Sequence, residues 1–275
     1  MSSVTLPSEP TAPRPQRARG HIGLGFTARG LQRLRQEGCG RCLLPNAFGG
    51  DPVAVVINTA GGLTGGDRFS VDLRLAGGAR AVLTTQAAER IYRAAGGRAE
   101  IANRLALGPG ASLHWLPQET ILFEHAAMTR RLEVEMAPDA RFLGLETLVL
   151  GRRAMGEALS RAAITDNWRI RRGGRLIHAE ALRLEGNVGA LAGRRALLDS
   201  ARALAVLVLV APDAEAMVDV ARGLLPAEGL RAAASAWEGR LVVRWMAADL
   251  QPLKRALGHF LNGFPGARVP SVWQI

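Results

Sequence analysis

The side chains best suited to chemistry in this sequence are seven carboxylates: Asp67, Glu89, Glu119, Glu124, Glu146, Glu157 and Glu180. Paired carboxylates can carry out general acid–base catalysis, or they can hold a hard cation through their oxygens. Spacing along the chain does not show which of them converge. Because charged side chains are rarely buried without a partner, most of the seven are expected at the surface or beside an arginine.

Other signatures of catalysis are weak. The five histidines lack the spacing of a helical metal motif such as HExxH, and no GxSxG nucleophile elbow occurs. Cys39 and Cys42 form a single CGRC motif, which is half of a zinc site or a redox pair. No second CxxC is present, so two reduced thiols in a loop and a contact with a soft metal both stay open.

A glycine-rich stretch, GGLTGGDRF at residues 61–69, raises the question of phosphate binding. Its conformationally special residues are Gly61, Gly62, Gly65, Gly66 and Asp67. A Walker A loop needs a lysine after its last glycine, and the only lysine of this chain is the distant Lys254. A dinucleotide fingerprint leads into a helix, whereas residues 69–75 alternate apolar and polar side chains like a strand. The pattern therefore disfavours phosphate binding.

Composition favours a cytoplasmic protein that meets acidic partners. The formal net charge is +11, and the arginines that dominate it are scattered in ones and twos. With one tyrosine and seven phenylalanines there are few surfaces for base stacking, so an acidic protein is a better partner than nucleic acid. No apolar run is long enough to cross a membrane. Residues 1–19, rich in proline, serine and arginine, are expected to form a disordered tail.

A weak repeat in the first half predicts stacked β-layers. The segments LAGGARAVL (75–83), LGPGASLHW (107–115) and MAPDARFLG (136–144) each contain a strand end, a tight turn and a new strand. Their aligned alanines, Ala79, Ala111 and Ala140, are 32 and 29 residues apart. We interpret each segment as a hairpin, and the recurrence as a solenoid-like or sandwich body. Chance similarity among ordinary hairpins is the alternative.

The remainder of the chain predicts an α+β end. We expect a strand at 203–210, a helix at 213–225 with Asp213 as N-cap, and a hairpin formed by 230–237 and 240–246 around Glu238 and Gly239. A second helix is expected at 249–261. This order fits two helices on one face of a sheet. The fold class is therefore mainly β, with a β-rich body at about 20–200, an α+β part at about 201–275 and a single domain over 20–275.

Four stretches in series resemble the UreD (UreH) family of urease accessory proteins. They are NTAGGLTGGDRF (58–69), LTTQAAERIYRA (83–94), LHWLPQETILFEHA (113–126) and ETLVLGRRAMGEAL (146–159). The resemblance runs from about residue 25 to the end and is weakest after residue 190. The motif residues that it singles out are Gly61, Gly62, Gly65, Gly66, Asp67, Thr84, Thr85, Tyr92, Arg93, Gln118, Glu119, Gly151, Arg152, Gly156 and Glu157.

The resemblance implies a role other than catalysis. Proteins of that family bind apo-urease and recruit UreF, which brings the nickel-carrying GTPase UreG. The assembly loads nickel and promotes carbamylation of the active-site lysine of urease. The implied fold is a stack of strands with few helices and an internal water-filled path for Ni²⁺, with no tightly bound cofactor. The helices expected at 213–225 and 249–261 are plausible docking places for UreF.

Three carboxylates are nickel-path candidates under that resemblance. Asp67 is the first, Glu180 in HAEAL the second, and Glu89, in a stretch where relatives vary, the third. A relay site must release its ion, so weak oxygen ligation is expected. For Asp67 the alternatives are an ion pair with Arg68 or Arg93, or a cap on the N–H groups of its own turn.

Two departures from the family pattern matter. Asn58-Thr59-Ala60 stands where many relatives carry His-Pro-Pro or Ser-Pro before the glycines, so an imidazole that suits nickel is absent there. The CGRC motif is not a family hallmark. An alternative function from another class is a β-solenoid enzyme, carbohydrate-active or transferase, that uses two carboxylates in an open cleft.

Overall fold

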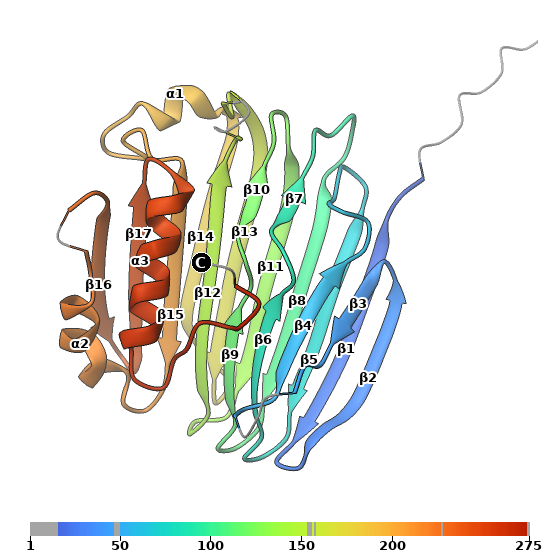
Figure 1. Ribbon diagram of the computed structural model, residues 1–275, viewed down its shortest axis with the longest axis vertical. Helices are drawn as coiled ribbons and strands as arrows, with labels where there is room; N and C mark the ends of the chain where they lie inside the picture. Colours follow the sequence, from blue (N-terminus) through green and yellow to red (C-terminus); the bar gives the residue numbers. More distant parts are fainter. Residues whose placement is uncertain (1–15, 47–49, 153–155, 157, 227, 274–275) are drawn as a thin grey trace, which may run out of the picture.

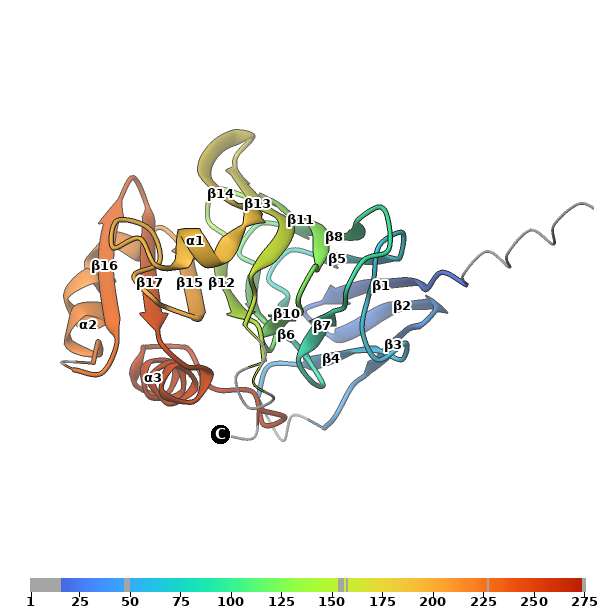
Figure 2. The ribbon, with the colours of Figure 1, turned by 90° about the horizontal axis from the view of Figure 1, so that it is seen from above.

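Two β-sheets lie face to face in the computed structural model, which describes residues 16–46, 50–152, 156, 158–226 and 228–273. The strands run side by side across most of the molecule (Figure 1), and the view from above shows the two layers, with helices at one end (Figure 2). The predicted fold class, a mainly β body of stacked layers with few helices, is confirmed.

The first sheet has seven strands in the order β14-β13-β11-β8-β5-β1-β2. They are β1 (Arg19–Thr27), β2 (Gly30–Gly38), β5 (Arg68–Leu75), β8 (Ala99–Leu107), β11 (Ala127–Met136), β13 (Arg161–Arg172) and β14 (Arg175–Asn187). The five inner strands run parallel to one another, whereas β2 and β14 pair antiparallel at the two edges.

The second sheet has ten strands, and its main path has the order β16-β17-β15-β12-β9-β6-β4-β3. They are β3 (Gly40–Leu43), β4 (Val53–Asn58), β6 (Arg80–Thr85), β7 (Glu89–Ile91), β9 (Ser112–Leu116), β10 (Thr120–Leu122), β12 (Arg141–Leu150), β15 (Ala203–Val210), β16 (Arg231–Trp237) and β17 (Arg240–Ala247). Strands β4, β6, β9 and β12 are parallel. Strand β10 joins β12 to β7.

The predicted repeat corresponds to real layers, but its turns do not form hairpins. Each turn carries the chain from the first sheet to the second, as from β5 to β6, so the strands on its two sides do not pair with each other. They pair in parallel with their equivalents one repeat later: Leu75 with Leu107, and Ala81 with Leu113. The hairpin interpretation was therefore wrong. Alternation within a strand does not identify the strand's partner.

The aligned alanines lie at the corners between the sheets. Ala79, Ala111 and Ala140 are at most 1% exposed. Successive corners are joined by backbone hydrogen bonds, because Ser112 N–H donates to the carbonyl of Ala79 and Arg141 N–H to that of Ala111. A small side chain suits a corner where the chain turns across a closely packed core.

Strand β15 is buried on both faces of the second sheet. Val208 and Val210 point into the core between the sheets, while Leu207 and Leu209 pack under the helices on the other face. Burial on both faces requires a nearly continuous apolar run rather than alternation. The predicted strand at 203–210 is confirmed residue for residue.

The helical elements are α1 (Val188–Ala192), the 3₁₀-helix η2 (Ala214–Met217), α2 (Val218–Gly223) and α3 (Leu250–Gly263). The second predicted helix is confirmed as α3, and the Asp249 carboxylate accepts the N–H of Leu250 at its start. Buried residues of α2 and α3 share one apolar cluster on the outer face of the second sheet, as predicted (Figure 1). The predicted hairpin is also present, as β16 and β17.

The first predicted helix, at 213–225, is wrong in its length, whereas Asp213 does occupy the predicted N-cap position. The segment is divided into η2 and α2, and the Asp213 side chain makes no capping hydrogen bond. That carboxylate instead accepts a hydrogen bond of 2.6 Å from Arg141, which lies at the start of β12. A long-range ion pair has taken the group that would have capped a regular helix.

The N-terminal boundary also differs from the expectation. Strand β1 begins at Arg19, inside the expected tail of residues 1–19, and residues 1–15 lie outside the described part. Ala18 is held as well, because its N–H donates to Asp67. Among the described residues, no helix combines the length and the apolar character needed to span a bilayer.

Candidate functional site

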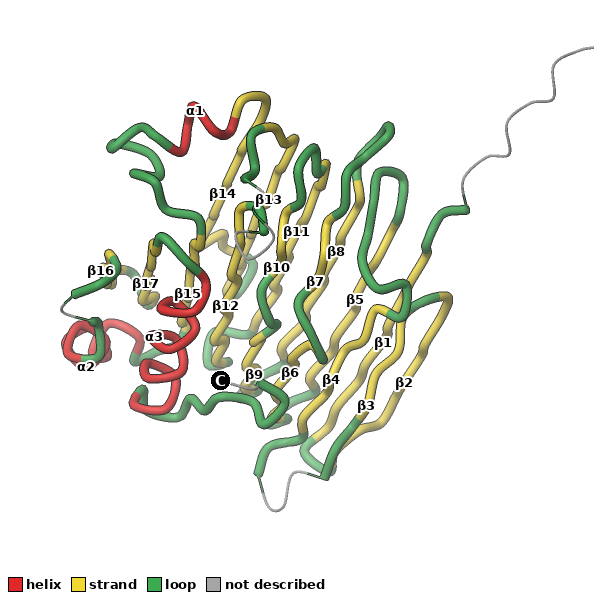
Figure 3. Tube along the Cα trace, turned by 45° about the horizontal axis from the view of Figure 1, so that its top comes forward, coloured by secondary structure: helices red, strands yellow, loops and turns green. Residues whose placement is uncertain are grey.

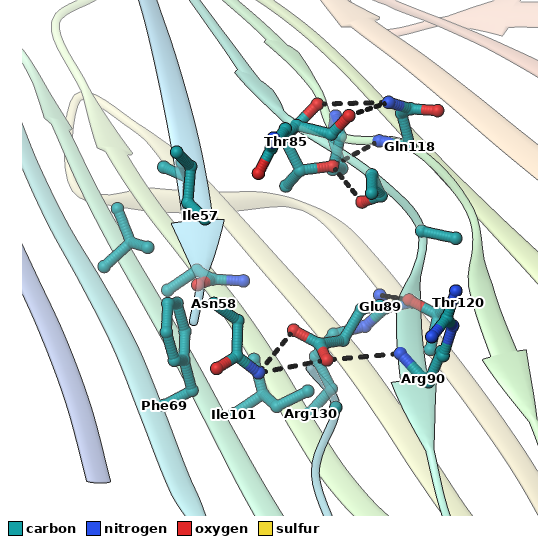
Figure 4. A pocket seen from close by; sticks show the side chains of 18 of the residues that line it. Ile57, Asn58, Phe69, Thr85, Glu89, Arg90, Ile101, Gln118, Thr120 and Arg130 are labelled. Carbon is teal, nitrogen blue, oxygen red and sulfur yellow. Dashed lines mark hydrogen bonds between the residues drawn. The ribbon is translucent and has the colours of Figure 1, made fainter. Parts of the chain in front are cut away.

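A cavity of about 280 Å³ lies between the two sheets. Its wall combines apolar and polar side chains (Figure 4). The polar set includes Asn58, Thr85, Glu89, Asn103, Gln118, Thr120, Arg130 and Glu146. Residues from the glycine stretch, the TTQ stretch and the WLPQE stretch thus meet at one place, although each lies on a different layer of the fold.

The glycine stretch passes close to the chain segment 90–97. A Cβ on Gly65 would stand 2.1 Å from the carbonyl oxygen of Gly96, and one on Gly62 would stand 2.8 Å from that of Arg90. Gly62 also has a φ of +148°, which side chains rarely adopt. The predicted roles of a sharp turn and a close approach to the next layer are therefore both present. This approach lets Gly61 and Gly62 form part of the cavity wall.

Asp67 caps the turn in which it lies. One carboxylate oxygen accepts the N–H of Thr64 at 2.8 Å, and the other accepts the N–H of Ala18 at 2.9 Å. The side chain is buried. Of the two structural alternatives named above, the geometry matches the cap, since Arg68 pairs with Glu100 instead.

We expect Asp67→Ala to lower the free energy of unfolding by about 2 kcal/mol or more. The change leaves two half-buried backbone N–H groups without acceptors, that of Thr64 in the turn and that of Ala18 before β1, and each such loss costs roughly 1–3 kcal/mol. Asp67→Asn keeps one acceptor oxygen and should lose less. Urea unfolding of the three proteins measures this order. Equal stability of Asp67→Ala and the wild type would contradict the capping role.

Glu89 extends from β7 into the cavity and is held by a neutral group. The Asn58 amide donates to its two carboxylate oxygens at 3.1 and 3.2 Å (Figure 4). Burial raises the pKa of Glu89 from 4.5 to about 7, and the hydrogen bonds from Asn58 and from the N–H of Arg90 offset only part of that rise. This carboxyl group therefore gains or loses its proton near neutral pH.

A buried ion cluster forms one end of the cavity and links the two sheets. Arg130 on β11 donates to both oxygens of Asp166 on β13, at 3.0 and 2.6 Å, and it also forms an ion pair with Glu146 on β12. Thr120 accepts a further hydrogen bond from Arg130, and the Trp115 indole N–H donates to Glu146. The cluster is almost inaccessible to solvent, so each charge depends on its partners.

Comparison with known proteins identifies the family. The family model described as UreD urease accessory protein matches residues 18–274. A urease accessory protein UreD of Methylobacterium sp. (strain 4-46) is 48% identical over 96% of this chain and 98% of its own length. Those of Rhizobium leguminosarum bv. viciae and Dinoroseobacter shibae are 47% and 48% identical, over 95% and 96% of this chain and 97% and 95% of their own lengths. The chain belongs to the UreD family.

Two of the motifs of this UreD-family chain are joined by the pair Thr85 and Gln118. The Thr85 hydroxyl accepts the backbone N–H of Gln118, and the Gln118 amide donates to the carbonyls of Thr85 and Gln86. Both side chains line the cavity (Figure 4). Their neighbours face the other side of the sheet: Thr84 accepts the indole N–H of Trp273, and Glu119 pairs with Lys254 at 3.0 Å.

The motif residues Tyr92, Arg93 and Arg152 lie around the glycine turn. The Tyr92 hydroxyl donates to the carbonyl of Gly61, and its ring meets Phe123 edge to face at 4.8 Å. The exposed Arg93 contributes its carbonyl, which accepts from the Thr64 hydroxyl. Arg152 lies over the Phe123 ring at 4.2 Å.

The other predicted motif positions contribute to the turn after β12. The buried Gly151 donates its N–H to Leu122, while Gly156 is exposed with a φ of +70°. Glu157, the remaining residue of this motif, lies outside the described residues.

Glu180 is not among the residues that line the cavity, and it lies on the edge strand β14. It forms an ion pair with Arg244 of β17, and the His178 ring nitrogen is 3.8 Å from its carboxylate. Burial, together with Arg240 and Arg244, lowers the pKa of His178 to about 4. Glu180 therefore joins the two sheets at β14 and β17 rather than meeting Asp67 or Glu89.

The two cysteines have different surroundings. Cys42 is buried in the core, and burial raises the pKa of its thiol to about 11, whereas Cys39 is half-buried near the end of β2. A thiol with so high a pKa stays protonated at neutral pH and makes a poor metal ligand. In the described ranges, no group of three or more His, Cys, Asp or Glu side chains is placed to hold a metal ion.

Residue types and spacing predicted neither Arg130 nor Asp166 as a member of this site, and they did not predict the contact of Asn58 with Glu89. A signal for Arg130 was present, because it is in phase with the inward-facing Leu132 and Val134 of the same strand. Alternation therefore placed a charge in the core, and a buried arginine requires carboxylate partners. Asn58 occupies the position where this sequence departs from many relatives, and it is the residue that holds Glu89.

Proposed function

We propose that this chain is a scaffold that binds urease apoprotein, recruits UreF and through it the GTPase UreG, and assists delivery of Ni²⁺ to the urease active site. Membership of the UreD family supports an accessory role rather than catalysis. The cargo ion would cross the cavity between the sheets. No resident cofactor is needed for this role.

The observation that carries the proposal is the position of Glu89 and the group that holds it. Its carboxyl group faces a cavity inside the protein and is held by an uncharged amide, so no fixed cation occupies its oxygens. Oxygen ligands hold divalent cations, and a carboxylate whose cavity also contains the cationic side chains of Arg90 and Arg130 binds them weakly. Weak binding suits a relay, because a site on a path must release its ion. We therefore place Glu89 first among the candidates, ahead of Asp67 and Glu180.

A groove of about 310 Å³ supports docking of UreF on the C-terminal helices. It is lined by residues that follow α2 and by one face of α3, including Leu224, Leu230, Arg255 and His259. The lining combines apolar side chains with charged ones of both signs, Arg255 and Glu228 among them, which suits an amphipathic partner segment. Val220 on α2 is also exposed.

The test is nickel loading of urease in cells that express the urease operon without this gene, complemented with wild type, Glu89→Gln, Asp67→Ala or Glu180→Gln. We expect wild type to restore activity and nickel content. Glu89→Gln should leave urease poor in nickel while the complex with urease and UreF still forms. Active, nickel-loaded urease in the deletion strain would refute the scaffold role. Full rescue by Glu89→Gln would remove Glu89 from the path and leave the scaffold role intact.

A further inference from the structure

The two sheets end, on the side away from the helices, at strands β2 and β3 (Figure 3). Within the described residues β2 pairs with β1 alone, so its outer edge is open, whereas the Gln36 side chain of β2 accepts the N–H of Cys42 on β3. Residues 31–38 of β2 are exposed along their whole length. A strand edge of this kind presents free N–H and C=O groups to another extended chain.

Leucines make this end apolar. Leu31 and Leu34 are 40% and 37% exposed, although they lie opposite the buried Phe26 and Leu24 of β1. Their side chains thus continue the core face of the sheet beyond the point where the second sheet covers it. Leu43 and Leu44, at the end of β3, are also exposed. Four of the eight large exposed apolar side chains in the described part of the chain lie here, which marks a binding surface rather than scattered exposure.

The polar face of the same edge is cationic. Arg33 and Arg35 lie opposite Gly25 and Gly23 of β1, so no neighbouring side chain covers them on that strand. Glu37 is the one carboxylate on β2, and Arg35 already holds it. The edge therefore combines a free backbone, apolar side chains on one face and excess positive charge on the other.

From this arrangement we infer that β2 is a docking edge for an extended, acidic segment of a partner protein, which adds as a further strand of the first sheet. The backbone edge fixes the extended conformation. Alternation along that strand places an apolar side chain against Leu34 and carboxylates against Arg33 and Arg35, while Leu31 lies beyond the bulge in the β1–β2 register. A second copy of this chain is disfavoured, since it carries the same arginines and a net charge of +11. The inference does not depend on nickel passage.

The probe is a synthetic peptide of alternating valine and glutamate, with a valine–lysine peptide as its counterpart. We expect the purified chain to bind the acidic peptide, more weakly as salt is raised, and to show new amide-exchange protection in β2. Arg33→Glu/Arg35→Glu should weaken that binding by about tenfold or more and should favour the lysine peptide instead. The matched control is Arg194→Glu/Arg195→Glu, which makes the same charge change at exposed loop positions and should bind like wild type.

If Arg33→Glu/Arg35→Glu gains binding of the valine–lysine peptide, this would show that the variant is folded and that charge selects the partner. Equal loss in the control variant, or protection outside β2, would overturn the inference in favour of general attraction to a basic protein. Failure of the acidic peptide to bind would also overturn it, and the arginines would then serve only to prevent edge-to-edge aggregation. A concentration-dependent dimer lost in Arg33→Glu/Arg35→Glu would replace the acidic partner with a second copy.

Discussion

Replacing Arg130 with methionine should lower the free energy of unfolding by about 3–5 kcal/mol. The change removes the only cation in contact with Asp166 and Glu146 in the described cluster, and both carboxylates are buried. Burial already raises the pKa of Glu146, and Arg130 offsets part of that rise. Without the guanidinium, the two acids must be buried as unpaired charges or protonated. Urea unfolding at neutral pH, with m-values compared, measures the loss.

The matched control removes the charges together. Arg130→Met combined with Asp166→Leu and Glu146→Leu leaves no uncompensated charge, and such apolar replacements of buried ion clusters are often neutral or stabilising. We therefore expect the triple variant to recover most of the stability that the single variant loses. If the triple variant is as unstable as Arg130→Met, the loss comes from packing around the long arginine side chain and not from unpaired charge.

Glu89→Gln should make the protein more stable above neutral pH, while it lowers nickel loading. The pKa of Glu89 is raised in the folded state from 4.5 to about 7, so the fold favours the protonated form. The wild type therefore loses stability as pH rises through this window, and the loss is complete above pH 7. Glutamine resembles the protonated acid and avoids that loss, which amounts to about 3 kcal/mol at most, given 1.36 kcal/mol per pKa unit.

The measurement is the difference in unfolding free energy between Glu89→Gln and wild type from about pH 4 to pH 8. We expect a difference near zero at the acid end that grows toward neutral pH. Burial also lowers the pKa of His114 and His178 to about 4, which destabilises both proteins equally in acid and cancels in the difference. Glu100→Gln, which makes the same substitution at an exposed residue, is the control for the change from Glu to Gln itself. A pH-independent difference for Glu89→Gln would argue against a raised pKa.

If Glu89→Gln stabilises the fold but lowers nickel delivery, that result would explain why a carboxylate is present at this position. Natural sites often keep groups that destabilise the fold because activity requires them. Glu89 would be such a group if the variant that unfolds less readily also delivers less nickel. The two readouts are independent, since unfolding is measured on the isolated chain and nickel on assembled urease.

Much of the fold followed from local chemistry. Turn-forming pairs, alternation and three aligned alanines predicted stacked layers about 30 residues apart, and the apolar run at 203–210 predicted a strand. The motif series pointed to the UreD family, which comparison confirmed. These features depend on residues close together in the chain, and a single sequence is enough to identify them.

Which side chains contact each other depended on the tertiary structure. Asn58 meets Glu89 across 31 residues, Trp115 meets Glu146 across 31, and Arg130 meets Asp166 across 36. These separations approximate one repeat, so the layer spacing that the alanines predicted also sets which side chains touch. The hairpin interpretation did not predict these contacts between repeats, because paired hairpin strands would have placed the contacts within one repeat.

Residue types and local spacing were enough to predict the layers, their separation, the family and the carboxylates worth testing. They did not show that Asp67 caps its own turn, that Glu180 lies on the edge strand β14, or that Glu89 faces the cavity. Charge state and ligand capacity depend on burial and on the neighbours that a side chain meets. Those neighbours come from layers that parallel pairing brings together, and no residue type or local spacing specifies them.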